Sequence, residues 1–298
     1  MTLMLLMILA SGQGSTMNLD EIYLDGLICS VTDEQRTAWI GFRREGPQIL
    51  GQLYIFEHAT RKAHLVSDGR FHVSGRSYLF KTEDGYALIN VQARTIFFLD
   101  VKGNYLDKLP FENLIGFEPD YQILSTVPKE EGIGVTFRMG NDWSKLLLAE
   151  LNLETRQFST IYLLEDPPEK GTWVFDDKAW LFLNQKTGRI DLLDQYFNVE
   201  KTLIPDMEPR LSVKNKQVAR LMRDRGFSPF VSHYEGFFVD GKKITTWRLL
   251  PEEDSPKWGQ LIIENSEVKF KKGGAVVLAT LQNHQLVFDR NEGEFLVQ

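Results

Sequence analysis

Apolar and β-branched residues recur along this chain in short runs separated by polar turns, and this pattern predicts strands almost throughout. The first four runs occupy 26–31, 38–42, 52–56 and 62–66. The segments between them, TDEQ, RREGP and EHAT, are rich in charged residues, and RREGP adds a glycine and a proline, which favour turns. We therefore expect four consecutive antiparallel strands at the start of the chain.

Two later stretches of the sequence superpose without a gap. They are YALINVQARTIFFLDVKGNYLDKL at 86–109 and WLFLNQKTGRIDLLDQYFNVEKTL at 180–203. In this alignment Asn90 falls on Asn184, and Asp100 falls on Asp194. The offset, 184 − 90 = 94 residues, equals two periods of about 47, a repeat length typical of propeller blades.

The grouping into fours continues along the chain. The further predicted strands are 78–81, 86–90, 95–101 and 105–109; 121–127, 134–138, 146–151 and 158–163; 173–175, 180–184, 189–194 and 200–203; 230–239, 244–249, 260–264 and 268–270. The last group has only three strands, at 275–281, 285–290 and 295–297, and 19–24 is predicted as an isolated strand. The predicted fold is an all-β, six-bladed β-propeller with four-stranded antiparallel blades. The N-terminal strand completes the last blade and closes the ring, which removes a free sheet edge.

Two segments interrupt this repeat. The insert at 205–229 contains the sequence KNKQVARLMRDR, in which Val218, Leu221 and Met222 recur at helical spacing and predict one short amphipathic helix. The second interruption is the loop at 251–258, which is rich in acidic residues. Both segments are expected on the same face of the propeller, and long loops in compact domains often carry function.

The first copy of the repeat resembles an NHL-type blade. Such blades carry an apolar strand, a polar turn, a strand that ends in Asp, and a glycine turn followed by leucine. The copy matches these features with YALIN at 86–90, with IFFLD ending at Asp100, and with Gly103 and Leu106. The whole chain resembles bacterial exported six-bladed propellers with NHL-like repeats. This resemblance implies the fold and the binding of ligands or proteins at one face, and it implies no reaction.

Composition is consistent with one large globular domain over 17–298. Hydrophobic residues make up 43% of the 298 residues and charged residues 25%, so the chain can bury a substantial core. The formal net charge of −7 argues against a nucleic-acid partner, which would require a basic surface. Cys29 is the only cysteine, which excludes an intramolecular disulfide.

The segment 1–16, MTLMLLMILASGQGST, is an apolar run followed by small residues. It resembles the hydrophobic region and cleavage zone of a secretory signal, although no lysine or arginine precedes Arg36. The run is too short to span a bilayer. We expect a leader or a disordered tail, and export to the periplasm or surface of a bacterial cell. The location is cytoplasmic if the segment is not a signal.

Common catalytic signatures are absent from the sequence, including H-E-x-x-H, G-x-S-x-G, the Walker motif and G-x-G-x-x-G. His72 and His233 lie near or within predicted innermost strands and can face a central channel, although a hydrogen-bonded structural role explains each more simply. Six-bladed lactonase-like enzymes hold a metal through channel carboxylates and amides. The carboxylates near strand ends that could serve in this way are Glu118, Asp120, Asp176 and Asp177. Because carboxylates are common in propeller turns, we expect no metal and no cofactor.

In a propeller, the loops between blades and the loops between second and third strands share one face. Arginine and tryptophan are favoured in recognition sites, and candidate ligand-binding residues on or near this face are Arg43, Arg44, Arg70, Arg94, Trp143, Arg220, Arg223, His233 and Trp258. Each has a structural alternative: the arginines as solvated turn charges, the tryptophans as blade packing.

The sequence therefore predicts a non-catalytic binding or scaffold propeller that binds at the face carrying 205–229 and 251–258. Its expected partner is a protein or a small anionic or carbohydrate ligand. The alternative is a propeller-type, lactonase-like hydrolase or lyase with a metal at the channel mouth. The alternative requires three or more carboxylates, amides or histidines that converge there.

Overall fold

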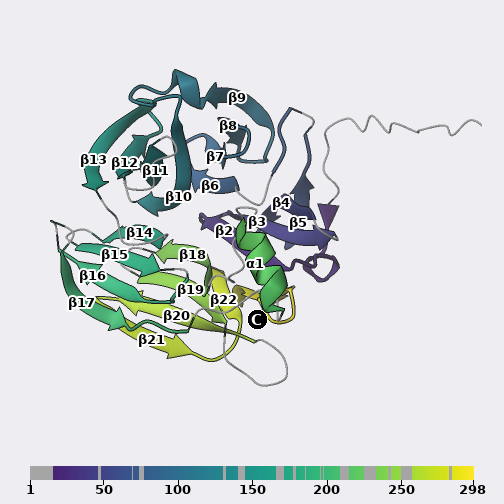
Figure 1. Cartoon of the computed structure of the whole chain (residues 1–298). Coiled ribbons are helices and arrows are strands. Elements are labelled where there is room, and N and C mark those ends of the chain that lie inside the picture. The colour runs from purple at the N-terminus through teal and green to yellow at the C-terminus, as the bar shows by residue number, and fades with distance from the viewer. Residues whose placement is uncertain are drawn as a thin grey trace, which may run out of the picture. The chain divides into compact units, whose positions relative to one another are not determined.

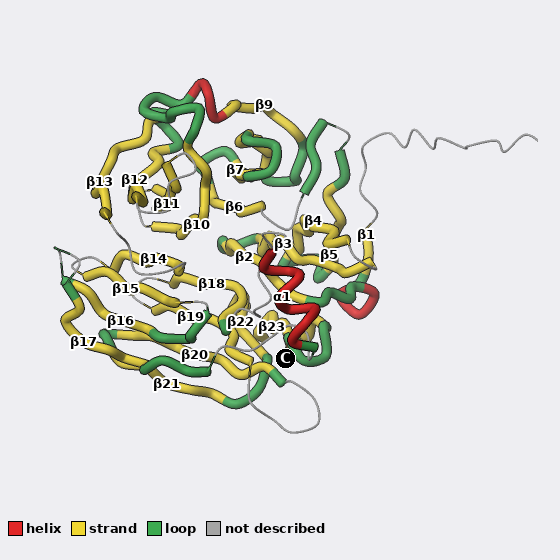
Figure 2. The backbone as a smooth tube through the Cα atoms, viewed as in Figure 1, coloured by secondary structure: helices red, strands yellow, loops and turns green. Residues whose placement is uncertain are grey.

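The computed structural model of this protein describes the residues 16–45, 48–68, 70–73, 77–129, 132–139, 145–165, 171–176, 179–184, 186–194, 196, 198–208, 215–224, 233–240, 243–249, 257–281 and 284–298. They form six sheets of antiparallel strands and one α-helix (Figures 1 and 2). The predicted all-β class is confirmed. The predicted leader at 1–16 lies outside these residues except for Thr16.

The chain divides into two compact units, and each is described by itself. Unit 1 comprises Met1–Lys108, Val277–Phe288 and Gly293–Gln298, and unit 2 comprises Leu109–Val276 and Asp289–Glu292.

Unit 1 begins with two sheets whose strands follow one another along the chain. The first has the strand order β1-β5-β4-β3-β2, and the second has the order β6-β7-β8-β9. The strands are β1 Thr16–Met17, β2 Gly26–Thr32, β3 Arg36–Glu45, β4 Gln48–Glu57, β5 Lys62–Val66, β6 Ser77–Lys81, β7 Gly85–Asn90, β8 Thr95–Asp100 and β9 Tyr105–Pro110. Strands β2 to β9 correspond to the eight strands predicted for the first two groups, although β3 and β4 are longer. The first sheet is not four-stranded as predicted, because Thr16 and Met17 of β1 pair with His64 and Ala63 of β5.

Strand β3 is longer than predicted, and this changes the position of two candidate residues. The sequence RREGP was predicted to be a turn. Instead, pairing with β4 continues through Arg43↔Leu50 and Arg44↔Ile49 to the end of the strand. Arg43 and Arg44 therefore belong to the strand, because their backbone groups have ladder partners in β4. Their side chains are exposed.

Unit 2 contains three sheets with the orders β10-β11-β12-β13, β14-β15-β16-β17 and β18-β19-β20-β21. The elements are the 3-10 turn η2 Phe111–Asn113, β10 Tyr121–Lys129, β11 Gly132–Met139, β12 Lys145–Asn152, β13 Gln157–Glu165, β14 Gly171–Asp176, β15 Ala179–Asn184, β16 Ile190–Leu193, β17 Val199–Ile204, α1 Lys216–Asp224, β18 Tyr234–Asp240, β19 Lys243–Leu249, β20 Trp258–Glu264 and β21 Glu267–Lys271. The strand predicted from 230 begins only at Tyr234, so His233 precedes it.

A three-stranded sheet of β22 Ala275–Leu281, β23 His284–Asp289 and β24 Glu294–Val297 ends the chain. The strand predicted at 19–24 is wrong, because Leu19–Glu21 form the 3-10 turn η1. The backbone N–H of Asn18 donates to the Glu21 carboxylate at 2.8 Å. This reciprocal cap stabilises a turn at the start of the segment in place of a strand.

Part of the expected pairing with the last strand remains. Tyr23 forms a single antiparallel bridge to Glu294, and the Leu24 N–H donates to the Gly293 carbonyl oxygen at 3.0 Å. The N-terminal segment thus contacts β24 at its edge through one bridge and one hydrogen bond.

The first sheet of unit 1 is buried on both faces. One face joins an apolar cluster with the second sheet, made of Ala38, Ile40, Leu53, Ile55, Phe71, Leu79, Tyr86, Leu88, Phe97 and Leu99. On the other face, Trp39 stacks on Tyr54 at 5.7 Å and on Phe295 of β24 at 4.5 Å between ring centroids. Alternate residues of β3 therefore serve two different cores, which explains its near-continuous apolar sequence.

The middle sheet of unit 2, β14 to β17, is enclosed in the same way. Leu181, Leu183, Ile190 and Leu192 pack against Tyr234, Ile244, Leu261 and Ile263 of the β18–β21 sheet, which lies beside it in Figure 1. On its opposite face, Trp180, Phe182 and Leu193 pack against Leu146 and Leu148 of β12.

The repeated asparagine and aspartate residues build matching turns in the two units. The Asn90 side-chain oxygen accepts the Ala93 N–H at 2.9 Å, and the Asn184 oxygen accepts the Lys186 N–H at 3.0 Å. Each side chain thereby mimics a backbone acceptor in the turn between the second and third strands of its sheet. The sequence repeat is thus explained by turn formation.

Helix α1 confirms the predicted helix and corrects its buried face. Val218 and Leu221 are exposed, at 41% and 56%, and Ala219 is buried. The small Ala219 side chain lies on the packed side of the helix, and Met222 is half-buried beside it. Among the described residues, no helix is long and apolar enough to cross a lipid bilayer.

Candidate functional site

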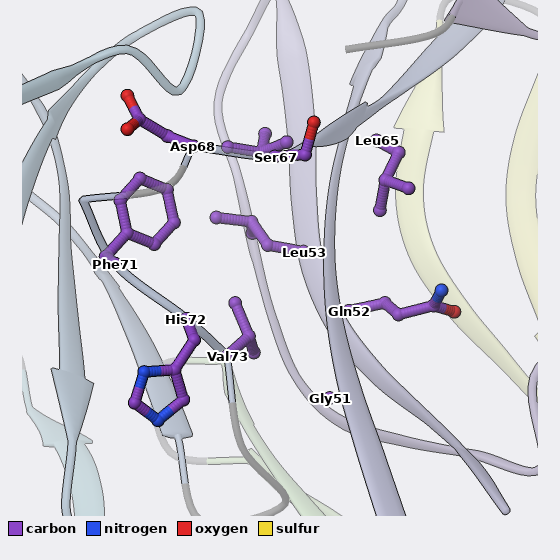
Figure 3. A pocket seen from close by; sticks show the side chains of 10 residues that line it. Gly51, Gln52, Leu53, Leu65, Ser67, Asp68, Phe71, His72 and Val73 are labelled. Carbon is purple, nitrogen blue, oxygen red and sulfur yellow. The ribbon is translucent and has the colours of Figure 1, made fainter. Parts of the chain in front are cut away.

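A cavity of about 470 Å³ opens in unit 1 beside the start of β4 and the end of β5. It is lined by Gly51, Gln52, Leu53, Leu65, Val66, Ser67, Asp68, Phe71, His72 and Val73. We call it the β4–β5 groove. Figure 3 shows the side chains of Leu53, Phe71 and Val73 turned toward a common space, with Ser67 and Asp68 at one end and His72 at the other.

The register of the first sheet positions the groove. Leu53 pairs with Val66, so Gln52 of β4 and Ser67 after β5 meet at the same end of the hairpin. Because side chains alternate along a strand, Leu53 points into the core while Gln52 extends to the other side of β4 (Figure 3). Leu53 therefore belongs to the apolar floor of the groove, whereas Gln52 borders the groove from the opposite side of β4.

Two contacts with the second sheet hold the segment after β5 in place. Phe71 is buried, and its ring lies 5.8 Å from that of Phe97. The side-chain amide of Asn90, which is fully buried, donates to the His72 carbonyl oxygen at 2.8 Å. These two contacts hold the 71–73 wall of the groove, so its shape does not depend on a ligand.

Asp68 and Arg70 form an ion pair at the margin of the groove. The Arg70 Nε donates to both Asp68 oxygens, at 2.9 and 3.0 Å, and the guanidinium lies 4.5 Å over the Tyr105 ring. The side-chain hydrogen bond from Arg70 lowers the pKa of Asp68 despite some burial, and Asp68 in turn raises the pKa of Arg70. The Asp68 carboxylate accepts hydrogen bonds from Nε and from Nη2 of Arg70. The other guanidinium N–H groups of this exposed arginine remain directed outward.

Several polar groups of the groove make no hydrogen bond within the part of the chain that the structure describes. These groups are the Ser67 hydroxyl, the His72 imidazole and the amide nitrogen of Gln52, whose oxygen accepts the Tyr54 hydroxyl at 3.2 Å. Ser67 and His72 are exposed to solvent and Gln52 is partly exposed, so a ligand can reach all three groups. Accessible polar groups beside an apolar floor are typical of small-molecule sites, and the volume lies within the usual range for such sites.

The other predicted residues of unit 1 do not line the groove. Arg43 is exposed near Tyr54; burial raises the pKa of Tyr54, and the positive charge of Arg43 lowers it in part. The Arg44 N–H donates to the Asp25 carboxylate at 2.6 Å. Arg94 lies in the β7–β8 turn with φ 49°.

The candidates of unit 2 do not converge on one another. Arg220 is exposed on α1, whereas His233 is buried just before β18. Arg223 belongs to α1, but its side chain lies outside the described residues, as does Trp143 entirely. The acidic loop at 251–256, expected to share a face with α1, also lies outside them.

Trp258 is held by a structural contact to the turn after β23. Its backbone N–H donates to the Asn291 side-chain oxygen at 2.8 Å, and the Asn291 amide donates back to the Trp258 carbonyl oxygen at 3.3 Å. The Arg290 guanidinium lies 4.8 Å over the indole ring. One face of this tryptophan is therefore already covered by a cation, which favours a packing role.

The carboxylates considered for a metal site do not gather within the described residues. No group of three His, Cys, Asp or Glu side chains able to hold a metal is found among them. Glu118 and Asp120 are exposed before β10, and Tyr121 beside them has a pKa raised by burial and by these two charges. Asp177 and the side chain of Asp176 lie outside the described residues.

Sequence reasoning missed the polar margin of the β4–β5 groove. Gln52 and Ser67 are common residue types with no characteristic spacing, and only the β4–β5 register brings them together. One signal was present, since the sequence Gly-Gln-Leu recurs at the start of the third strand in the first and fifth groups. Gln260 of the second copy is buried, so the recurrence alone marks strand position.

No protein-family model matches the sequence, and a search of curated proteins found no match. An oligogalacturonate lyase in complex with manganese is a structural neighbour at 13% identity and a TM-score of 0.49, and the match covers 96% of this chain and 81% of that one. A proposed 6-phosphogluconolactonase from Bacteroides uniformis matches at 12% identity and a TM-score of 0.42, covering 91% and 82%. At this level of similarity, no activity is transferred to the chain.

Proposed function

We propose that this protein is a non-catalytic, ligand-binding β-propeller, and that the β4–β5 groove of unit 1 binds a small hydroxyl-rich molecule of the carbohydrate class. The observation that carries the proposal is the combination of an apolar floor with solvent-accessible polar groups at Gln52, Ser67 and His72, which line the same cavity. Hydroxyl groups of a sugar both donate and accept, which matches an amide, a hydroxyl and an imidazole. The apolar floor suits the C–H face of a sugar ring.

Arg70 extends this proposal to ligands that carry a negative charge. Its guanidinium is oriented by Asp68 and by Tyr105, so its outward N–H groups are held in place before a ligand arrives. The pairing with Asp68 cancels most of its charge, so a ligand with a single acidic substituent fits better than a highly charged one.

The finer features of the fold belong to the same proposal. We propose six blades in a single domain over 17–298, with the ring closed where Tyr23 and Leu24 meet the last sheet. Consecutive antiparallel sheets that are each buried on both faces support this architecture. The NHL-like character of the blades, export to the bacterial envelope, and a contribution of 205–229 and 251–258 to binding remain part of the proposal.

The test is isothermal titration calorimetry with a panel of neutral and acidic mono- and oligosaccharides. Gln52→Ala, Ser67→Ala and His72→Ala should each weaken binding by about tenfold, the value of one lost hydrogen bond to a ligand. Gln285→Ala, on the exposed side of β23, is the matched control and should bind as the wild type does. Unchanged affinity in all three groove variants would contradict this site.

Incubation of the bound sugar with the protein separates binding from catalysis. Recovery of the sugar unchanged supports the non-catalytic function. Turnover that is lost on treatment with a chelator would instead support the hydrolase or lyase alternative with a metal.

A further inference from the structure

Unit 2 contains a half-buried arginine, Arg248, that no carboxylate of the described residues neutralises. The guanidinium of Arg248, near the end of β19, makes no ion pair among the described residues. Its one hydrogen-bond contact there is with the Met207 sulfur. A thioether is a weak acceptor, whereas a guanidinium removed from water normally requires an anion.

Neighbouring residues of the β18–β19 hairpin position this arginine. Tyr234 pairs with Arg248 across the β18–β19 ladder, and the Tyr234 hydroxyl donates to the Gly188 carbonyl oxygen. Burial raises the pKa of Tyr234, and the charge of Arg248 opposes this rise only in part, so the hydroxyl stays protonated and keeps its hydrogen bond. Arg248 is therefore set beside a rigid turn.

Met207 occupies the space next to the guanidinium. Its backbone N–H donates to the Thr187 carbonyl oxygen at 2.7 Å, which places Met207, after β17, against the turn that follows β15. A Cβ added at Gly188, where φ is 70°, would lie 1.9 Å from the Met207 methyl carbon and 3.1 Å from His233 Cγ. Met207, Gly188 and His233 thus form one packed wall beside Arg248.

Arg189, in the same unit, differs from Arg248 because its guanidinium is paired with carboxylates. Arg189 Nε lies 2.7 Å from an Asp191 carboxylate oxygen, and its Nη1 lies 3.6 Å from Asp206. Thr202 also donates to Asp191 at 2.8 Å. Arg189 is compensated by two acidic residues, and Arg248 by none that the structure describes.

We propose that Arg248 is the anchor of an anion-binding site in unit 2, which takes the carboxylate or phosphate group of a small ligand. The anion replaces the Met207 thioether as the partner of the guanidinium, and the unbranched methionine side chain can move aside to admit it. The planar fork of the guanidinium matches the paired oxygens of either group. This site is separate from the β4–β5 groove and does not rest on the function proposed for that groove.

The experiment measures binding of inorganic phosphate and of malonate by calorimetry, with thermal unfolding at a constant ionic strength set with chloride. Both methods should detect binding of at least one probe to the wild-type protein, and the probe that binds identifies phosphate or carboxylate as the ligand group. Arg248→Met should abolish binding. Arg248→Lys should weaken it by about tenfold or more, because an ammonium group lacks the fork.

Arg189→Met is the matched control, since it also removes one guanidinium from the same unit. It should lower the unfolding temperature, because Asp191 is buried and loses its partner, yet it should leave anion binding unchanged. Arg248→Met, by contrast, should not lower the unfolding temperature in chloride alone, because it removes an uncompensated charge. If neither probe binds the wild type, or if Arg248→Met and Arg248→Lys both bind as the wild type does, the proposal is overturned.

Discussion

The Asp100 carboxylate and Asn104 close a turn on each other from both directions. Asp100 accepts the Asn104 backbone N–H at 2.9 Å and its side-chain amide at 2.8 Å, while the Asp100 N–H donates to the Asn104 carbonyl oxygen at 2.9 Å. Asp194 and Asn198 repeat this arrangement in the other unit, with the same backbone pair at 2.9 and 3.0 Å. The aspartate that ends the third strand is therefore a structural element of the repeat.

Replacing this aspartate should destabilise the fold without affecting ligand binding. Asp100→Ala removes three accepted hydrogen bonds, including that of Lys102, and should lower the free energy of unfolding by about 1–2 kcal/mol, allowing for partial exposure. Urea unfolding measures the change. Glu83→Ala, at an exposed turn position, is the control and should have no effect. Equal midpoints for the two variants would show that the turn contributes nothing.

Low pH should lower the free energy of unfolding through two carboxylates, those of Asp33 and Asp100. Burial would raise the pKa values of Asp33 and Asp100, but hydrogen bonds from Lys81 to Asp33 and from Asn104 to Asp100 lower them below the ordinary value. A group with a depressed folded pKa stabilises the protein above its unfolded pKa, and this contribution is lost as pH falls through the folded pKa. Stability should therefore decline from about pH 4 downward. Asp100→Asn should show a shallower decline when unfolding free energies are compared at pH 7 and pH 3.

The strand pattern was predictable in the β1–β5 and β14–β17 sheets because apolar clusters on both faces impose apolar residues on successive positions. The turns at Asn90 and Asp100 were visible as a repeat for a similar reason, since only short polar side chains close them. The predicted strand at 19–24 failed because the capping box of Asn18 and Glu21 is a local competitor of β pairing. Apolar residues alone did not reveal this competition.

Side-chain positions that depend on tertiary packing were not predictable. Helical spacing identified α1 but not its packed side, because the small Ala219 allows closer approach than Val218 or Leu221. Similarly, the position of Arg248 beside Met207 depends on the β18–β19 register and on the path of the chain after β17, which no local pattern encodes.

The single cysteine should be inert in the folded protein. Burial raises the pKa of Cys29 to about 12, and backbone hydrogen bonds from Leu79 and Ile40 oppose this rise only in part. Since the thiolate is the reactive form, a disulfide reagent at pH 8 should label native protein slowly and urea-unfolded protein rapidly. Rapid stoichiometric labelling of the native state would show that this part of β2 opens readily.

A contact between β3 and the N-terminal segment offers the sharpest test of packing in unit 1. A Cβ added at Gly41 would lie 2.1 Å from Leu24 Cδ1, and Leu24 is fully buried, so its side chain cannot move aside. Gly41→Ala should therefore destabilise the protein by about 1–3 kcal/mol through overpacking. Leu24→Ala alone should cost about 2–4 kcal/mol, because it leaves a cavity next to Gly41.

The double variant distinguishes this contact from two independent losses. In Gly41→Ala/Leu24→Ala the new methyl group occupies part of the space that the leucine vacates, so the total loss should be smaller than the sum of the single losses by at least about 1 kcal/mol. Urea unfolding of the wild type, the two single variants and the double variant completes the cycle. Additive losses would mean that the segment carrying Leu24 is not seated against β3 in solution. The contact of Tyr23 and Leu24 with the last sheet would then lose its support, and with it the proposed closure of the ring.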